Sequence, residues 1–346
     1  MADHMQAVVL TGHGGPDRLE YRHDVPVPRP GVGEVLIAVR AAGVNNTDIN
    51  TRVGWYASTD APDGAAWTGS PVAFPRIQGA DACGAIVEVG RGVSEGRIGE
   101  RVVVRSCLRS LRKDGVDPWL GSEIDGAFAQ FVCVPAAEAF RVESELSDVE
   151  LAAAPCSYGT AENLLERARV IADERVLVTG ASGGVGGAAV QLARRRDARV
   201  VAVAASDKAP EVRALGAAEV LDRNADLVEE LGQRSIDVVI DLVGGPRWPD
   251  LLRVLRRGGR YAASGAIGGP RVELDLRTLY LNDLTLLGCT SWADGVFENL
   301  VGYLERREIV PTVAATFPLE RIAEAQAAFE AKRHVGKIVL VVPAAG

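Results

Sequence analysis

The chain has 346 residues, of which 47% are hydrophobic and 24% charged, and its formal net charge at pH 7 is −8. This length predicts two domains, and the composition is that of a globular protein with a sizeable core. The acidic balance argues against broad binding to nucleic acid or anionic membranes, and no apolar run is long enough for a transmembrane helix. We expect no signal peptide, and five scattered cysteines are typical of a reducing cytoplasm.

The first 140 residues or so predict short β-strands joined by turns. Alternating apolar runs recur at 6–10, 34–40, 84–90 and 101–105, and this texture is typical of an all-β or barrel-like unit. Residues 51–75 contain several Gly and Pro without periodicity, which predicts a long loop of a kind that is often functional. The sequence Ser147-Asp-Val-Glu150 is a capping box and predicts the start of a helix.

From about residue 174 the chain alternates between strand and helix patterns. Strands are predicted at 175–179, 199–204, 218–221, 237–242, 260–263 and 284–289, with helices between them, notably at 184–195 and 247–255. Six such strands predict a doubly wound parallel sheet with helices on both faces. Two further helical patterns lie near 296–306 and 319–332, and the chain ends with a strand at 337–342.

The most informative motif is the turn that follows the first strand of this second region. It comprises Gly180, Ala181, Ser182, Gly183, Gly184, Val185 and Gly186. We expect Gly180 to allow a tight turn, Gly183 to let a pyrophosphate approach the backbone, and Gly186 to let helix and strand pack closely. The helix N-terminus offers free N–H groups to phosphates. A plain structural turn is the alternative, since the spacing differs from the standard G-x-G-x-x-G.

Taken together, the motifs resemble the medium-chain dehydrogenase/reductase superfamily, and more narrowly its zinc-free quinone oxidoreductase (zeta-crystallin-like) branch. The resemblance covers nearly the whole chain and rests on Gly43-Val-Asn-Asn-Thr-Asp48, Gly79-Ala-Asp-Ala-Cys-Gly84, Asp125-Gly-Ala-Phe-Ala129, Thr160-Ala161, the loop 179–187, Leu215-Gly-Ala217 and Gly336-Lys-Ile-Val-Leu340. It implies an α/β protein with a GroES-like β-barrel domain at 1–140 and 290–346. It also implies a Rossmann domain at 141–289, hydride transfer from NAD(P) in the cleft between them, and a homodimer, with the strand at 284–289 pairing across a two-fold axis.

The resemblance also bears on metal binding. Zinc alcohol dehydrogenases of this superfamily hold a catalytic ion with Cys, His and Cys beside a Glu, and the matching positions here are Asn45, Ala80, Cys156 and Asp81. Only Cys156 is a good zinc ligand, whereas a catalytic zinc needs three protein ligands. The stretch that matches the structural zinc lobe, 105–118, has only Cys107. The sequence therefore predicts no metal site.

The residues after the second strand of the predicted sheet favour NADPH over NADH. This strand ends Val201-Ala-Val-Ala-Ala205, without the acid that usually binds the ribose of NAD. Ser206 and Lys208 follow, and a hydroxyl beside an ammonium suits a 2′-phosphate. Asp207 complicates this, because its carboxylate can meet a ribose hydroxyl or repel a phosphate. A second interpretation makes Ser206 and Asp207 the cap of the next helix, and both readings can hold.

Without zinc, a conjugated acceptor is easier to reduce than a simple carbonyl, because the charge spreads to a distant oxygen. The sequence thus predicts a cytoplasmic, NADPH-dependent reductase of a quinone or an α,β-unsaturated carbonyl. By resemblance, Asn45 and Asp48 line the cleft, and Tyr56 donates a hydrogen bond or a proton to the substrate or stacks on its ring. The resemblance also implies cofactor contacts from Thr160, Val243, Gly244, Ser264, Gly265, Ala266, Ile267, Gly336 and Lys337.

Each of these assignments has a simpler alternative. Asn45 and Asp48 are also typical of a turn or helix cap, Tyr56 of a surface-loop aromatic, and Lys337 of a charged strand start. Trp55, Trp67 and Trp292 form either an apolar substrate wall or ordinary packing. For the whole protein, the alternatives are an alcohol dehydrogenase with an atypical zinc site and a non-catalytic NADPH-binding protein.

Overall fold

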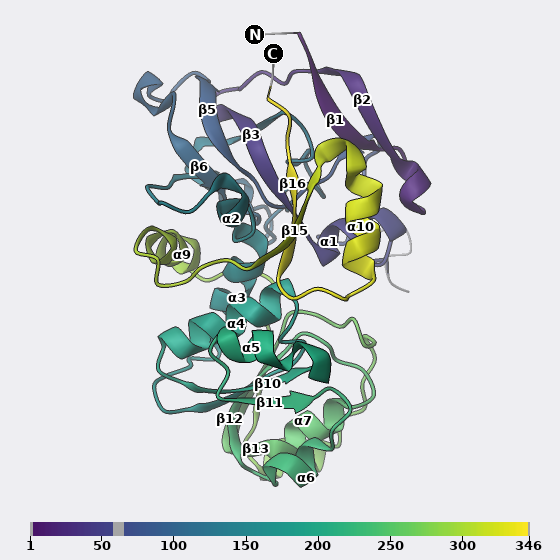
Figure 1. The fold of residues 1–346 in the computed structure, drawn as a ribbon, viewed down its shortest axis with the longest axis vertical. Coiled ribbons are helices and arrows are strands. Elements are labelled where there is room, and N and C mark those ends of the chain that lie inside the picture. Colours follow the sequence, from purple (N-terminus) through teal and green to yellow (C-terminus); the bar gives the residue numbers. More distant parts are fainter. Residues whose placement is uncertain (1–2, 58–65, 345–346) are drawn as a thin grey trace. The chain divides into compact units, whose positions relative to one another are not determined.

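The computed structural model describes residues 3–57 and 66–344 (Figure 1). They form two units, the first made of 1–156 and 297–346 and the second of 157–296. Each unit has its own sheets. Residues 58–65, part of the predicted long loop at 51–75, lie outside the described residues.

The first unit is mainly β-structure. Its strands are β1 (His4–Leu10), β2 (Leu19–Pro26), β3 (Glu34–Val44), β4 (Arg76–Ile77), β5 (Cys83–Val89), β6 (Arg101–Val104), β7 (Phe131–Pro135), β8 (Ala139–Arg141), β15 (Val313–Pro318) and β16 (Lys337–Val341). Its helices are α1 (Asn46–Val53), α2 (Asp148–Ala152), α9 (Val296–Glu305) and α10 (Ile322–Glu330), while α3 (Pro155–Arg167) begins here and continues in the second unit. One sheet has the order β2-β1-β4, and the other β15-β16-β3-β5-β6-β8 with β7 also paired to β3.

Strand β3 organises the larger sheet. It is apolar over most of its length, and its neighbours β5, β7 and β16 all run antiparallel to it. The last strand, β16, pairs Ile338 with Val44, so the C-terminal segment returns to the sheet of the N-terminal part, as the resemblance implies. Continuing this register brings Lys337 opposite Asn45.

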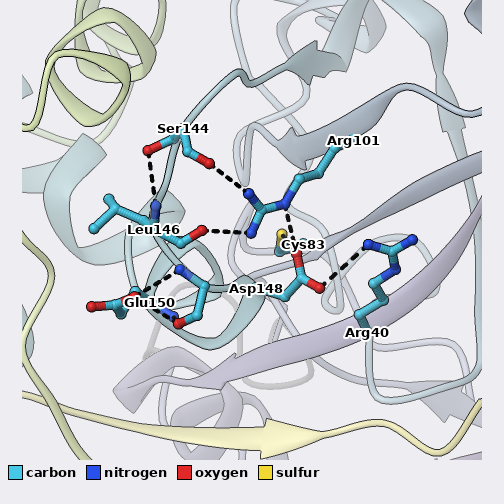
Figure 2. Close-up of polar contacts among 8 residues, drawn as sticks. Arg40, Cys83, Arg101, Ser144, Leu146, Asp148 and Glu150 are labelled. Carbon is cyan, nitrogen blue, oxygen red and sulfur yellow. Dashed lines mark hydrogen bonds and ion pairs between the residues drawn. The ribbon is translucent and has the colours of Figure 1, made fainter.

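The segment between β8 and α2 is held in place by Arg101 (Figure 2). Its guanidinium donates to the Asp148 carboxylate at 2.6 Å and to the main-chain oxygens of Ser144 and Leu146 at 2.9 and 2.7 Å. Arg40 forms a second ion pair with Asp148, at 3.4 Å. These contacts fix the start of α2, which leads directly into α3.

The second unit is built on one parallel sheet. Its strands are β9 (Arg175–Val178), β10 (Arg199–Ala204), β11 (Glu219–Asp222), β12 (Ile236–Asp241), β13 (Leu255–Ala263) and β14 (Thr285–Gly288), and its other helices are α4 (Gly184–Arg195), α5 (Ala209–Ala214), α6 (Leu227–Leu231), α7 (Trp248–Val254) and α8 (Leu276–Leu281). The spatial order is β11-β10-β9-β12-β13-β14, which is the doubly wound order of a Rossmann sheet.

Both faces of this sheet are covered. Leu177 packs with side chains of α6 and α7 on one face, whereas Val176 and Val178, which alternate with it along β9, are equally buried. Helix α4 contacts β9 and β10. The predicted parallel sheet is therefore confirmed.

The local predictions also hold for most elements. Helix α4 has the predicted bounds, and the predicted capping box is present, with Glu150 N donating to Ser147 Oγ at 3.2 Å. Strand β13 begins earlier than predicted, because Leu255 already pairs with Ile236 before the chain bends through the glycines at 258–259. In the part of the chain that the structure describes, no helix is long and apolar enough to cross a membrane.

Candidate functional site

The N-terminus of α1 carries the predicted catalytic residues. Asn45 is the N-cap, and its N–H donates to the Asp48 carboxylate at 2.7 Å, so Asp48 does cap the helix. Asp48 is only 2% exposed. Burial, together with the nearby Asp81 carboxylate, raises the pKa of its carboxyl from 3.8 to about 7, against the hydrogen bond from Asn45 and the charge of Lys337. The Asp48 carboxyl therefore titrates near neutral pH.

A buried ion pair lies directly beside this helix start. Lys337 Nζ donates to Asp81 Oδ2 at 3.0 Å, to the main-chain oxygen of Val44 at 2.9 Å, and to Asn45 Oδ1. Asn45 Nδ2 in turn donates to Asp81 Oδ2 at 2.8 Å. Since an ammonium group has three N–H donors, the Lys337 side chain has none left for a cofactor phosphate, and only the main chain at 336–337 is left for the predicted contact.

Asp81 connects this ion pair to the start of α3. Its Oδ1 accepts a hydrogen bond from the Cys156 N–H at 2.6 Å. The Cys156 thiol is buried, and burial together with the Asp81 charge raises its pKa well above the ordinary 9.0. We call Asn45, Asp48, Asp81, Cys156 and Lys337 the buried polar cluster.

The buried polar cluster does not suit zinc. Its candidate ligands are the Asn45 amide, an Asp81 carboxylate already paired with an ammonium, an Asp48 carboxyl already bonded to the Asn45 N–H, and a thiol that burial keeps protonated. Zinc instead binds thiolate, neutral histidine or free carboxylate. Among the described residues, no group of three or more His, Cys, Asp or Glu side chains is placed to hold a metal ion.

In the stretch that matches the structural zinc lobe, an ion pair joins the two ends of the loop. Arg112 donates to both oxygens of the buried Asp117 carboxylate, at 2.6 and 2.8 Å. Lys113 and Val116 form an isolated β-bridge between these two residues. A bidentate ion pair thus ties together the base of this loop.

Tyr56 folds back onto the first turns of α1. Its hydroxyl donates to Thr47 Oγ1 at 3.1 Å and accepts a hydrogen bond from Asn50 Nδ2 at 3.4 Å. Burial raises the pKa of the phenol, so it keeps its proton at neutral pH. Tyr56 is therefore part of a hydroxyl pair at the end of α1 that bears Asn45. Thr47 lies inside the motif 43–48 and was not predicted as a site residue.

Aromatic rings surround Tyr56. Trp55 and Trp67 contact its ring edge to face, with centroids 5.5 and 5.2 Å away, and Trp67 stacks on Trp119 at 4.7 Å. Trp55 is 44% exposed, whereas Trp119 is buried. Two of the three predicted tryptophans thus gather at Tyr56, and Trp119 joins them without a local sequence signal. Trp292 instead packs in the second unit, against Gly159 of α3, which supports the packing interpretation for that residue.

In the second unit, the glycine loop has the predicted backbone form. Gly180 has φ +60°, a conformation that side chains disfavour. A Cβ on Gly186 would lie 2.2 Å from the Gly180 oxygen, so only glycine fits there. Around Gly183, the N-cap of α4, the nearest atom to an added Cβ is 3.4 Å away. The first turn of α4 therefore presents its free N–H groups beside open backbone, which suits a pyrophosphate.

The carboxyl ends of the neighbouring strands are tied together by Asp241. Its carboxylate accepts hydrogen bonds from Thr179 Oγ1 and the Tyr261 hydroxyl, each at 2.6 Å, and from the Val243 N–H at 3.0 Å. This network links β9, β12 and β13 where strand order reverses, the usual ligand position in such sheets. Asp241 was not predicted as a site residue, although an acid at the end of a strand is a visible signal in the sequence.

The two other predicted cofactor loops lie side by side. Gly268 N donates to the Val243 oxygen at 2.7 Å, and Gly245 N donates to the Gly269 oxygen at 3.1 Å. The loop with Val243 and Gly244 therefore packs on the loop that continues from 264–267. Thr160 is buried in α3.

Ser206 and Lys208 form a short turn after β10. The Ser206 main chain and hydroxyl both donate to the Asp222 carboxylate at the end of β11. Neither Ser206 nor Asp207 is the N-cap of α5, which is Lys208, so the helix-cap interpretation is wrong. Lys208 is largely buried.

The comparisons with known proteins agree with this architecture. Residues 31–144 match the alcohol dehydrogenase GroES-like domain family, and residues 215–340 match the zinc-binding dehydrogenase family. The acryloyl-coenzyme A reductase of Metallosphaera sedula is 32% identical over 97% of this chain and 99% of its own length. The quinone oxidoreductase of Rattus norvegicus is 29% identical, over 97% and 98%. A solved structure from Sinorhizobium meliloti 1021, provisionally described as an alcohol dehydrogenase, is 47% identical with a TM-score of 0.94, covering 99% and 98% of the two chains.

Fold and site together define an α/β oxidoreductase with a GroES-like β domain and a Rossmann sheet. The chain belongs to the medium-chain dehydrogenase/reductase superfamily.

Proposed function

We propose that the protein is an NADPH-dependent, zinc-independent reductase that adds hydride to a conjugated carbonyl, either a quinone or an α,β-unsaturated carbonyl. The observation that carries this proposal is the buried ammonium of Lys337 on Asn45 and Asp81, at the positions that match the zinc site of the alcohol dehydrogenases. A site without a Lewis acid suits an acceptor in which the charge spreads to a distant oxygen.

The glycine loop and the first turn of α4 would hold the pyrophosphate through main-chain N–H groups. The loops at 243–244 and 264–267 and Thr160 would hold the nicotinamide half. When bound, the cofactor supplies the hydride.

The chain's own residues orient the acceptor and move the proton. Tyr56 keeps its phenolic proton and donates it, or a hydrogen bond, to the acceptor oxygen, where negative charge develops as the β-carbon receives hydride. Asn45 and Asp48 hold the end of α1 that carries the Thr47 hydroxyl, and Thr47 keeps Tyr56 in place. Trp55 and Trp67 supply apolar surface for a planar acceptor.

The names of two relatives support a conjugated acceptor. Quinones and acryloyl thioesters share a carbon–carbon double bond conjugated to a carbonyl group, and the two relatives are named for reducing one or the other. This shared chemistry, rather than either particular substrate, is what we carry to the present chain.

NADPH is favoured by the end of β10, which carries no acid, and by Ser206 and Lys208 just after it. The Asp222 carboxylate beside Ser206 reduces this preference. The protein is further proposed to be a cytoplasmic homodimer. All five cysteines are free thiols, β14 is an open edge of its sheet, and the neighbouring α8 exposes Leu276, Tyr280 and Leu281.

The test is oxidation of NADPH and of NADH by the metal-stripped protein, with 9,10-phenanthrenequinone, 1,4-benzoquinone and a short alkenone as acceptors. Turnover with NADPH is expected. Turnover only after zinc and an alcohol with NAD(P)⁺ are added would replace the proposal with an atypical alcohol dehydrogenase. Tight NADPH binding without turnover of any acceptor would indicate a non-catalytic binding protein.

A further inference from the structure

The ammonium group of Lys337 lies in the interior of the first unit. The residue is only 1% exposed, and its Nζ reaches three oxygen acceptors. A buried charge of this kind persists only where partners replace its water. Here the partners are the last residue of β3 with the adjoining N-cap of α1, and the loop before β5, two segments that are far from residue 337 in the sequence.

Asp81 provides the opposite charge and is fully buried. Each of its oxygens is used, Oδ1 by the Cys156 N–H and Oδ2 by Asn45 and Lys337. The carboxylate is also closely packed, because a Cβ added to Gly43 would lie 2.4 Å from Oδ2. The Lys337–Asp81 pair is therefore a fixed joint between β16, β3, the start of α1 and the start of α3.

The joint also determines how the Asn45 amide is oriented. Its oxygen accepts from Lys337, and its nitrogen donates to Asp81 at 2.8 Å and to the Gly43 oxygen at 3.3 Å. An amide with opposite partners at its two ends has one favoured orientation. Because Asn45 caps α1, its orientation affects the helix end that carries Thr47 and, through it, the Tyr56 hydroxyl.

We propose that Lys337 is a positioning residue whose ammonium takes the structural place of a metal cation, holding Asn45 and Asp81 so that α1 presents Thr47 and Tyr56 to the acceptor. A cation is needed here because Asp81 is a buried carboxylate, and an ammonium meets this need with three directed N–H bonds. The expected effect of Lys337 on turnover rests on the proposed function, whereas its expected effect on the stability of the first unit does not.

The test is chemical rescue of Lys337→Ala. Truncation leaves a cavity shaped for an alkyl chain that ends in an ammonium group, so propylammonium is the probe, and 1-propanol is the matched neutral control. We expect kcat with a quinone to fall by about 30-fold while the KM for the acceptor changes by less than about threefold, because a transition-state geometry is lost rather than a binding contact. Propylammonium should restore kcat several-fold and raise the Tm of the variant, whereas propanol and zinc should do neither.

Two further variants keep the test decisive. Lys113→Ala removes an exposed lysine of the same unit and should match the wild type in both kcat and Tm. If Lys337→Ala does not fold, Lys337→Met with Asp81→Asn removes both buried charges. That double variant should fold, show a low kcat and show no response to propylammonium.

Three results would overturn the proposal. They are a normal kcat in Lys337→Ala, rescue by propanol as effective as rescue by propylammonium, and rescue by zinc. If the wild type reduces no acceptor, the proposed function fails instead. The change in Tm on adding propylammonium to Lys337→Ala would still decide whether the ammonium holds the joint together.

Discussion

The two units use different parts of the chain to build their proposed sites. In the second unit, the glycine loop works through its main chain, and its key requirement is that Gly186 has no side chain. In the first unit, the buried polar cluster is held together by side-chain contacts among Asn45, Asp81 and Lys337, which lie far apart in the sequence. A backbone site is sensitive to shape, whereas a buried ionic site is sensitive to charge and therefore to pH. The predictions below test this contrast.

The largest effect is expected from pH on Asp48. The pKa of its carboxyl is raised to about 7 in the folded protein from 3.8, so the folded state binds the proton more tightly than the unfolded state. Ionisation of Asp48 is therefore expected to leave the free energy of unfolding unchanged below about pH 4, where the carboxyl is protonated in both states. Its cost grows as pH rises towards 7 and reaches at most about 4 kcal/mol. Urea unfolding between pH 4 and 8 should show this decline in the wild type.

The matched variant is Asp48→Asn, which keeps an oxygen to accept the Asn45 N–H but has no charge. Its free energy of unfolding should decline less over the same pH interval. Parallel pH profiles for the two proteins would show that Asp48 does not titrate in this range.

The next effect concerns shape in the glycine loop. Gly186→Val forces side-chain atoms against the Gly180 oxygen, and overpacking of this kind costs about 3 kcal/mol. NADPH binding measured by calorimetry should weaken by roughly 100-fold. Gly183→Ala has room for its methyl group, so this variant should keep the wild-type Tm. Its affinity for NADPH should fall only if the pyrophosphate lies against Gly183. Equal affinities for all three proteins would show that the loop does not bind the cofactor.

Removal of the phenolic hydroxyl tests the chemical role of the first unit. Tyr56→Phe keeps the ring contacts with Trp55 and Trp67 but removes the proton donor. The kcat for quinone reduction should fall by about 100-fold, equivalent to ~2.7 kcal/mol, with little change in Tm. Tyr21→Phe, which removes a half-buried phenolic hydroxyl of the same unit that donates to Gln6 of β1, is the control. A Tyr56→Phe enzyme with normal kcat would assign the proton to solvent.

The smallest effect is expected at the adenosine end of the predicted cofactor site. Asp222→Asn removes the negative charge that Ser206 contacts, while the amide oxygen still accepts its hydrogen bond. The KM for NADPH should fall by about threefold and that for NADH should change less, since solvent and salt screen an exposed charge. An equal change in both KM values would place the 2′-phosphate away from Ser206.

The same contrast explains which features could be predicted from the sequence. The turn at Gly180, the close packing at Gly186 and the bounds of α4 depend on neighbouring residues, so a local pattern was sufficient. The role of Lys337 depends on β16 pairing with β3, and the stacking of Trp119 on Trp67 depends on two loops meeting. Lys337 was predicted as a cofactor contact from its place in the motif at 336–340. The motif does not reveal the direction of the Lys337 side chain, which depends on the pairing of β16 with β3.

The position of β16 in the chain has a consequence for biosynthesis. The ammonium that completes the buried polar cluster is made 292 residues after Asn45, and its strand is a direct neighbour of β3. During translation, β3 keeps an open edge on this side and Asp81 lacks its cationic partner until β16 leaves the ribosome. Prematurely terminated chains therefore lack both the strand and the cation, so an incomplete product cannot assemble the site.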